Sequence, residues 1–544
     1  MTLLLFSMEG YFLLLRRLRK DLNPAFYPAL TVSIISVMTC LGGMAGLLFW
    51  TARALWVIGL SAFFLQGILF FRKIIRKETK DQGPFLRMCG TFLFFFVGMI
   101  LLTRNRFIYH YDDFSHWGLV VKIMLQMNRM PASSDGLLFP SYPLGSASFL
   151  YFFCSVPGSG AEYLLTAQSV MLVSFLLSLQ SVAEKKWACY LLASSMIPLF
   201  LFYNTPLDGL PVDNLLGAAY LAAMLLYLRK NREPGKALPE IMLILACCVL
   251  IKNSGIFLAL GLMMLIVVWQ VREKKRIQWI WLWMALPLMV FLAWRIHLKI
   301  GFTDYGKHYM SVYTYYGTLR GKLGEIGQIF RVILPVMINP LTNHALWLIP
   351  AFALVYRITV PERQKEQERT LRICAVFFVL YEAGILLMYI CSMGTGELYM
   401  QNGRDFPRYN GTILCVLAGV LMEMISRSGV GTDFPVKKRK SLFLMIAIIL
   451  MVGCMGMNLT SLKTLEECSR EYPEARALSI ATDGQIYTEE GEYAVIFPKP
   501  AVAGYEQYMA AYYLYPAKNI RCYGTGAEIL KFGDGVSLID LRQE

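Results

Sequence analysis

Two adjacent carboxylates are the first residues of the sequence whose types and spacing could do chemistry. Asp112 and Asp113 lie in the aromatic segment 107–117, a few residues after an apolar run. Ionisable groups at the end of a membrane span are costly and usually serve a function. If the segment is helical, Asp112 and His116 share one face, where a carboxylate and an imidazole can share a proton or bind a divalent ion such as Mg²⁺ or Mn²⁺.

The same residues also have a structural interpretation. A carboxylate in the first turn of a helix caps free backbone N–H groups and interacts favourably with the helix dipole. Aromatic residues such as those around Asp112 are typical of any membrane interface. Asp112 with His116 therefore permits a metal ion without requiring one, and the sequence predicts no cofactor with certainty.

The elements that must position these side chains are membrane helices. The chain has 544 residues, of which 56% are hydrophobic and 16% are charged, whereas soluble domains have about 45–50% and about 25%. The apolar residues fall into runs of about 15–23 residues, the length that crosses about 30 Å of hydrocarbon. We predict an all-α polytopic membrane protein with about 12–14 transmembrane helices. The expected spans are 26–49, 53–71, 86–103, 161–181, 187–203, 210–228, 238–251, 255–271, 279–296, 344–358, 373–391, 409–427 and 441–459.

Basic residues orient these spans. The net charge is +15, but the Lys and Arg residues form short clusters between apolar runs, which is the positive-inside pattern rather than a nucleic-acid surface. With these clusters in the cytoplasm, residues 104–145, 297–343 and everything after 460 lie outside a bacterial plasma membrane. Residues 324–340 are then an interfacial helix, because counting them as a span would reverse the orientation.

The C-terminal residues 460–544 differ from the predicted transmembrane domain 1–459. Short apolar stretches at 493–497 and 536–539 indicate strands, and residues 505–515 indicate a helix. We expect a small α/β extracytoplasmic domain that either helps to recognise the acceptor or gate its access, or is a folding cap without contact to substrate. Cys468 and Cys522 lie in this domain and could pair.

Further polar residues follow the acidic pair in a definite order. Tyr142 lies in a Ser-Tyr-Pro-Leu-Gly stretch, and Lys252 interrupts two apolar runs. The others sit at predicted span ends on the outer side: Asp208, Asp213, Arg404, Arg408 and Tyr409. Each cation is equally explained as a side chain that reaches from a span end to the interface.

This order resembles the GT-C-fold glycosyltransferases, which include protein O-mannosyltransferases and the aminoarabinose transferases of lipid A. The resemblance covers residues 86–430 and implies that Asp112 and Asp113 match the acidic catalytic pair. It implies substrate-binding roles for His116, Tyr142, Asp208, Asp213, Lys252, Arg404, Arg408 and Tyr409. The sequence departs from the pattern in its second acid, Asp rather than Glu, and in the single proline after Tyr142.

The resemblance implies an enzyme that transfers a hexosyl or pentosyl group from a polyprenyl-phosphate donor to an extracytoplasmic acceptor. The acceptor is a glycan, a lipid or a protein of the cell envelope, and the bilayer is the other partner. Two alternatives stay open, namely a transporter or flippase and a polymerase or ligase of lipid-linked saccharides. An acidic pair early in the chain favours the enzyme, because transport gives no reason to expect it.

Overall fold

The computed structural model of the chain describes residues 1–75, 82–183, 187–202, 209–229, 237–272, 280–305, 319–321, 324–359, 365–391, 405–428, 464–498, 504–524 and 536–542. Its long helices are α1 (Thr2–Leu18), α2 (Tyr27–Met44), α3 (Leu48–Ile75), α4 (Gly83–Thr103), α7 (Ala161–Leu176), α8 (Trp187–Phe202), α9 (Asp213–Arg229), α10 (Leu238–Ile251), α11 (Gly255–Arg272), α12 (Ile280–Gly301), α15 (His344–Thr359), α16 (Lys365–Cys391) and α18 (Phe406–Ser428). Shorter helices are α5 (Gly118–Met127), α6 (Gly145–Cys154) and α14 (Ile326–Ile338).

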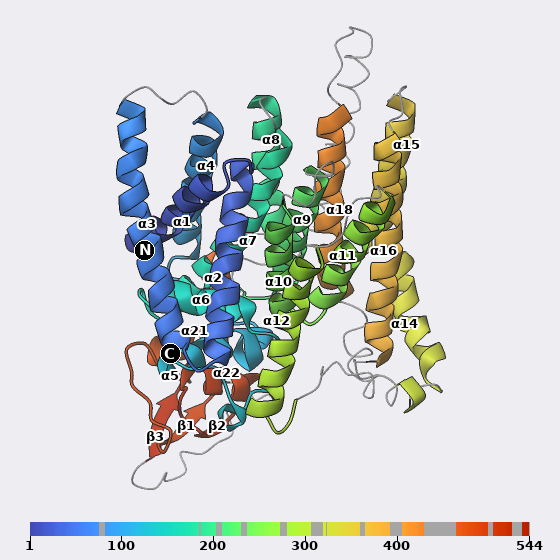
Figure 1. Ribbon diagram of the computed structural model, residues 1–544. Helices are drawn as coiled ribbons and strands as arrows, with labels where there is room; N and C mark the ends of the chain where they lie inside the picture. The colour runs from blue at the N-terminus through green and yellow to red at the C-terminus, as the bar shows by residue number, and fades with distance from the viewer. Residues whose placement is uncertain are drawn as a thin grey trace.

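The long helices form a bundle that confirms the predicted polytopic fold (Figure 1). Every predicted span from 26–49 to 409–427 coincides with a helix, whereas the predicted span 441–459 lies outside the described residues. Within the described part of the chain, seven helices are both long and apolar enough to cross a membrane. The segment of α7 is buried on all sides, while α3, α4, α11, α12 and α16 carry exposed large apolar side chains.

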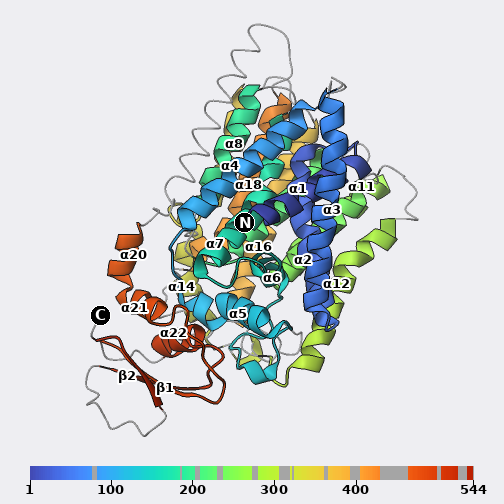
Figure 2. The same cartoon turned by 90° about the vertical axis from the view of Figure 1, so that its left-hand side faces the viewer.

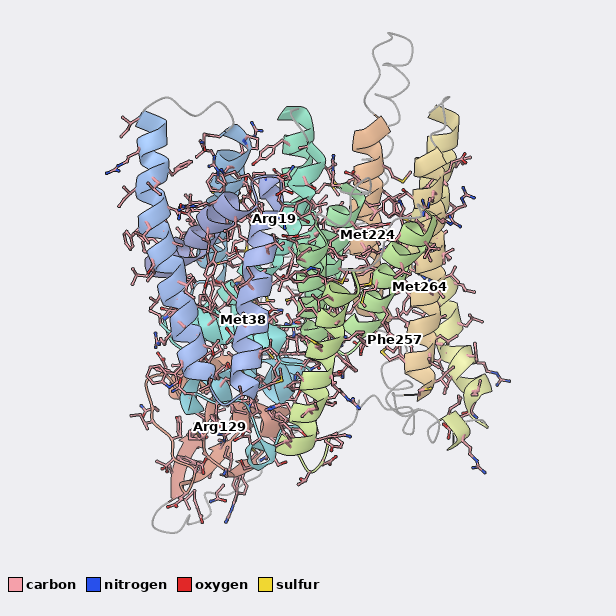
Figure 3. The ribbon with its side chains drawn as sticks, in the orientation of Figure 1. Arg19, Met38, Arg129, Met224, Phe257 and Met264 are labelled. Atoms are coloured by element: carbon pink, nitrogen blue, oxygen red, sulfur yellow. The ribbon has the colours of Figure 1, made fainter. Side chains whose placement is uncertain are left out.

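The exposed apolar side chains mark the surface that faces lipid. Met38 on α2 is 48% exposed, and Phe257 and Met264 on α11 are 58% and 69% exposed (Figure 3). In water such a belt would be costly, at about 25 cal/mol for each Å² of apolar surface. Charged residues such as Arg129, which pairs with Asp135 at 2.7 Å, lie near one end of the bundle.

The two ends of the bundle carry different structural elements. The C-terminal ends of α3, α15 and α18 lie at one end, and the small sheet lies at the other with α5, α22 and the C-terminal end of α12 (Figure 1). The segment of Asp112 precedes α5 and therefore lies on the same side as the sheet. The side of the membrane on which this end lies stays a prediction.

Several short apolar segments form helices that do not cross the bundle. Residues 326–338 form α14, so the helix expected there is present, while its interfacial position stays a prediction. Residues 145–154 form α6. Helix α5 ends at Met127 and is capped by Asn128, which adopts the left-handed conformation with φ 51° that Asn tolerates better than most residues. Helix α5 directly follows the aromatic segment that ends at Trp117.

The C-terminal residues form a compact α/β unit beside α5 (Figure 2). It contains α20 (Leu465–Glu471), α21 (Pro473–Ala481), α22 (Tyr505–Tyr513) and three parallel strands, β1 (Glu492–Ile496), β2 (Asn519–Tyr523) and β3 (Val536–Asp540), in the order β2-β1-β3. The predicted strands and helix are confirmed, and β2 was not expected because polar residues interrupt its apolar pattern. Cys468 and Cys522 are both free in this structure, so the pairing that the sequence allowed is absent.

Candidate active site

Asp113 joins two segments far apart in the chain. It begins a π-helical turn, η2 (Asp113–Trp117), and its side chain is fully buried. Both of its carboxylate oxygens accept a hydrogen bond from the backbone N–H of Leu210, at 3.1 and 3.2 Å. A buried carboxylate that is hydrogen-bonded in this way is stabilised in place. Asp113 therefore fixes the acidic segment to the residues that lead into α9.

Asp112 has a different environment from its neighbour. Its side chain is 40% exposed, and its Oδ2 atom accepts a hydrogen bond from Nη1 of Arg408 at 2.7 Å. Arg408 lies in the first turn of α18, which begins at Phe406. Of the two predicted catalytic acids, Asp112 is the one that solvent and a substrate can reach.

Lys252 and Asp213 extend this ion pair into a cluster. Asp213, the first residue of α9, accepts a hydrogen bond from Lys252 Nζ at 2.5 Å and lies 3.6 Å from Arg408 Nε. The Asp213 side chain is only 7% exposed, so its charge is largely removed from water and is compensated by two cations. Asp112, Arg408, Asp213 and Lys252 thus form one chain of alternating charges, which we call the ionic cluster.

The position of Lys252 depends on a tight break between α10 and α11. Helix α10 ends at Ile251, Lys252 is extended with φ −153° and ψ 150°, and α11 begins at Gly255. A Cβ atom at Gly255 would lie 2.0 Å from the carbonyl oxygen of Cys248, so glycine is required for the turn. The break turns Lys252 toward α9 and α18.

Tyr409 lies under both cations of the ionic cluster. Its ring centroid is 4.9 Å from Lys252 Nζ and 5.1 Å from Arg408 Cζ, which is within cation–π range. Arg408 Nη2 also donates to the Tyr409 hydroxyl at 3.3 Å. Thr412, one turn further along α18, donates to the backbone carbonyl of Asp213 at 2.9 Å. Helices α9 and α18 are therefore joined directly below the cluster.

The Tyr142 segment is tied to the Lys252 break by backbone contacts. The carbonyl oxygen of Ser141 accepts hydrogen bonds from Asn253 Nδ2 at 3.3 Å and Trp294 Nε1 at 3.4 Å. Burial raises the pKa of Tyr142 well above its ordinary value, and the nearby charges of Tyr409, Asp112 and Asp213 act in the same direction. Tyr142 therefore stays protonated beside the ionic cluster.

His116 is surrounded by aromatic side chains. Its ring is 5.2 Å from that of Tyr142 and 4.6 Å from that of Trp117, and the Trp117 and Tyr142 rings stack at 5.3 Å. Burial lowers the pKa of His116 to about 3, so the imidazole is neutral. Neither ring nitrogen has a hydrogen-bond partner among the described residues.

These surroundings do not fit the metal ion that Asp112 and His116 permitted. Asp112 is held by the Arg408 cation, and His116 is enclosed by aromatic rings. In the described part of the chain no three His, Cys, Asp or Glu side chains come together in a way that could hold a metal ion. The Mg²⁺ or Mn²⁺ ion stays a prediction.

Asp405 is a further acid at this site, and it was not among the site residues predicted from the sequence. It precedes α18, and burial raises the pKa of its carboxyl, against the lowering effect of Arg408. Asp112 and Asp213 are close enough to raise that pKa further. Its place directly before the Phe-Pro-Arg-Tyr stretch was the available signal, because a residue there faces the same end of α18 as Arg408.

The structure brings most of the predicted site residues together. Asp112, Asp213, Lys252, Arg408 and Tyr409 share the ionic cluster, and Tyr142 lies beside it. Asp113 and His116 lie one and four positions after Asp112 in the chain, but both side chains are buried. Asp208 and Arg404 lie outside the described residues.

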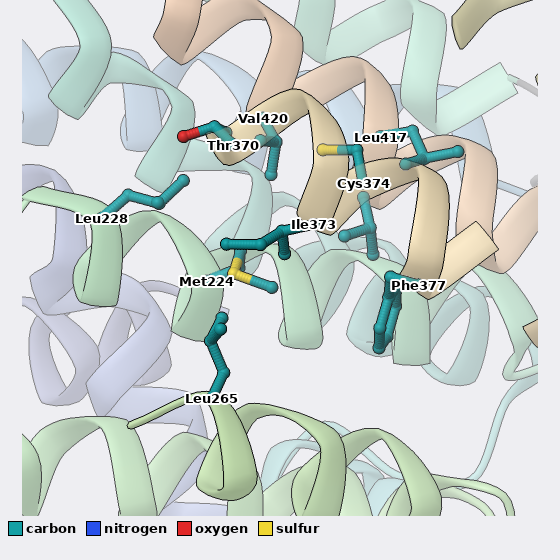
Figure 4. A pocket seen from close by; sticks show the side chains of 10 residues that line it. Met224, Leu228, Leu265, Thr370, Ile373, Cys374, Phe377, Leu417 and Val420 are labelled. Atoms are coloured by element: carbon teal, nitrogen blue, oxygen red, sulfur yellow. The ribbon is translucent and has the colours of Figure 1, made fainter. Parts of the chain in front are cut away.

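An apolar pocket lies between α9, α11, α16 and α18 (Figure 4). Met224, Leu265, Phe377 and Val420 contribute to its lining, which contains no carboxylate, imidazole or amine. It therefore offers no acid–base chemistry. From Arg408 it is about 12–18 Å further along α18, at about 1.5 Å per residue.

Comparison with known proteins identifies a structural relative. No family model matches the sequence, and no curated protein matches it. A solved structure is similar to this chain. It is the crystal structure of ArnT from Cupriavidus metallidurans bound to undecaprenyl phosphate, which is 12% identical over 82% of this chain and 87% of that chain, with a TM-score of 0.46.

Proposed function

We propose that the protein is an integral-membrane glycosyltransferase that moves a sugar from a polyprenyl-phosphate donor to an acceptor outside the plasma membrane. The observation that carries this proposal is the ionic cluster, in which an accessible carboxylate, Asp112, contacts one of two cations gathered around Asp213. Sugar transfer from a lipid phosphate needs a base for the acceptor hydroxyl and cations for the departing phosphate. The cluster supplies both kinds of group.

Arg408 and Lys252 are the groups that would bind the donor phosphate. The planar guanidinium of Arg408 suits a bidentate contact with phosphate oxygens, and Lys252 supplies a point charge. Both cations are paired with carboxylates in this structure. A phosphate that binds Arg408 competes with Asp112 for the guanidinium. Donor binding would therefore release the Asp112 carboxylate at the moment when a base is needed.

The reaction then balances without a further reactant. The acceptor oxygen forms a bond to the anomeric carbon while the bond from that carbon to the phosphate oxygen breaks. The proton of the acceptor hydroxyl passes to Asp112, and the polyprenyl phosphate leaves with one more negative charge than it had in the donor. Arg408 and Lys252 stabilise that developing charge, which is the electrostatic part of catalysis.

Asp112 is the better candidate for the base within the acidic pair. Asp113 has both oxygens engaged by the Leu210 N–H and is fully buried, so an acceptor hydroxyl cannot approach it. Asp112 is 40% exposed, and its charge helps to raise the pKa of the nearby, half-buried Tyr142. We infer that Tyr142 and Tyr409 form the wall against which the sugar is held.

The first experiment is a direct assay of the purified protein in lipid nanodiscs. Binding of undecaprenyl phosphate is measured, and transfer is measured from a panel of radiolabelled polyprenyl-phosphate hexoses and pentoses to cell-envelope acceptors. The proposal expects saturable binding of the lipid phosphate and transfer of at least one sugar, and both should be weaker in the Arg408→Ala variant. The proposal would be overturned if the protein bound neither the lipid phosphate nor any of the donors.

A further inference from the structure

Helix α22 of the C-terminal unit contacts the backbone just before the acidic pair. The hydroxyl of Tyr513 donates to the carbonyl oxygen of Ile108 at 2.7 Å, and the hydroxyl of Tyr505 donates to that of Tyr109 at 2.8 Å. Residues 106–110 belong to no helix or strand. Their carbonyl groups therefore lack the regular backbone hydrogen bonds of a helix or sheet, and buried carbonyls need a donor from elsewhere.

The same helix also contacts the chain just after the acidic pair. The ring of Phe114 lies 5.5–5.9 Å from those of Tyr505, Tyr512 and Tyr513. Gly118 allows a close approach here, because a Cβ atom at that position would be 3.1 Å from the Tyr512 ring. These ring contacts bury apolar surface of η2 against α22.

A third contact fixes the direction of α22. Lys122, in the middle of α5, donates from Nζ to the carbonyl oxygens of Tyr512 and Tyr513, at 2.7 and 3.1 Å. These carbonyls belong to the last turn of α22, where a helix leaves acceptors unpaired and the dipole favours a cation. Helix α22 is therefore bound to the loop before Asp112, to the turn after it and to the helix that follows.

We propose that α22 is a positioning element for Asp112, and that Tyr505 and Tyr513 set the place of this carboxylate relative to Arg408. The catalytic consequence rests on the proposed function. Asp112 lies between the two stretches that α22 holds, and its Oδ2 atom must meet an arginine from a helix almost three hundred residues later. Loss of either tyrosine hydroxyl frees a backbone carbonyl within four residues of Asp112.

A domain that only caps the fold would behave differently. If α22 were only a cap, removing its contacts with the acidic segment would lower the stability of the whole protein. The turnover of each folded molecule would be unchanged. A positioning element instead changes kcat, because a small displacement of a catalytic group has a large effect on rate. Donor binding should change little, since Arg408 and Lys252 are held by Asp112 and Asp213 and not by α22 in the described part of the chain.

The test uses the full-length variants Tyr505→Phe, Tyr513→Phe and the double variant, each of which keeps the ring and removes only the hydroxyl. We expect kcat to fall about 10-fold in the single variants and about 100-fold in the double variant, with the donor KM within about twofold of wild type. Amide hydrogen exchange of residues 106–112 should become faster in all three. Tyr487→Phe is the matched control, because this tyrosine packs on Tyr493 within the same unit and away from the acidic segment.

The outcomes separate this inference from the proposed function. If the double variant shows unchanged hydrogen exchange in residues 106–112 and an unchanged kcat, the positioning role is overturned. The proposed transferase function still stands in that case if the wild type is active. A wild type without transfer would overturn the function, and the exchange measurement would still decide whether α22 holds the loop. An equal loss of stability and of activity per mole of total protein, with normal kcat for the folded fraction, would show that α22 is only a cap.

Discussion

Arg408 donates a hydrogen bond of 2.7 Å to Asp112, although the two residues are 296 positions apart in the chain. The bond connects the first turn of α18 with the end of the loop that follows α4. It pairs the most exposed acid of the ionic cluster with the cation that also reaches Asp213. This relationship gives different roles to residues that look alike in the sequence.

The two acids of the pair should respond differently to the same substitution. Asp112→Asn removes the proposed base and should lower kcat by about 10²–10⁴-fold with little effect on folding. Asp113→Asn weakens a buried clamp on Leu210 and should cost about 1–3 kcal/mol of stability, with a smaller effect on the kcat of the folded protein. Steady-state kinetics and thermal unfolding of both variants check this. The reverse order of effects on kcat would assign the base to Asp113.

The cations should govern donor affinity. Lys252→Gln and Arg408→Ala should each weaken binding of undecaprenyl phosphate by about 10–100-fold, because hydrogen bonds to charged groups are worth about 1.5–3 kcal/mol. Arg408→Lys keeps the charge and should restore only part of the affinity, since a lysine cannot make the bidentate contact.

Surface cations supply the control for this series. Lys518 and Arg470 form exposed ion pairs with Glu489 and Glu466, which contribute little to stability. Lys518→Gln and Arg470→Ala should bind the lipid phosphate as wild type does. Equal affinities of all four charge-removing variants would show that the cluster does not hold the phosphate.

The C-terminal unit should be accessible from outside the cell. Ile486 is 92% exposed in the loop before β1, so a cysteine at this position can react with a membrane-impermeant thiol reagent. In a background that lacks Cys468 and Cys522, we expect Ile486→Cys to be labelled in intact cells. Arg272→Cys, at the end of α11 and in a predicted cytoplasmic cluster, should be labelled only after permeabilisation. The opposite pattern would place the candidate site in the cytoplasm.

His116 should make the protein sensitive to acid. Burial lowers its pKa to about 3, whereas an unfolded histidine has a pKa of about 6.5. The unfolded state therefore binds more protons between these values, and stability is lost as the pH falls below about 6.5, at up to about 1.4 kcal/mol per pH unit. Thermal unfolding of wild type and His116→Leu between pH 7.5 and about 4.5 measures this effect. The variant should show a shallower pH dependence, and parallel curves would contradict the assignment.

The spans and the candidate residues follow from the sequence alone. Runs of apolar residues long enough to cross a bilayer must form helices there, because unpaired backbone groups are too costly in hydrocarbon. For that reason the segments later seen as α10 and α11 could be predicted almost to the residue, with Lys252 in the break between them. Strand β2 could not, because its alternating burial depends on neighbours that come from elsewhere in the chain.

The roles of the candidate residues were decided only by the tertiary structure. Asp112 and Asp113 are chemically identical and adjacent, and their difference arises because Leu210 meets one and Arg408 meets the other. His116 was a plausible partner of Asp112 until the packing of Tyr142 and Trp117 enclosed it. The contact of α22 with the acidic segment has no local signal either, because a tyrosine hydroxyl and a carbonyl 405 positions away share no pattern in the sequence. Periodicity reports which face of a helix is apolar, whereas charge pairing and hydrogen bonding between distant segments depend on the distances that folding sets.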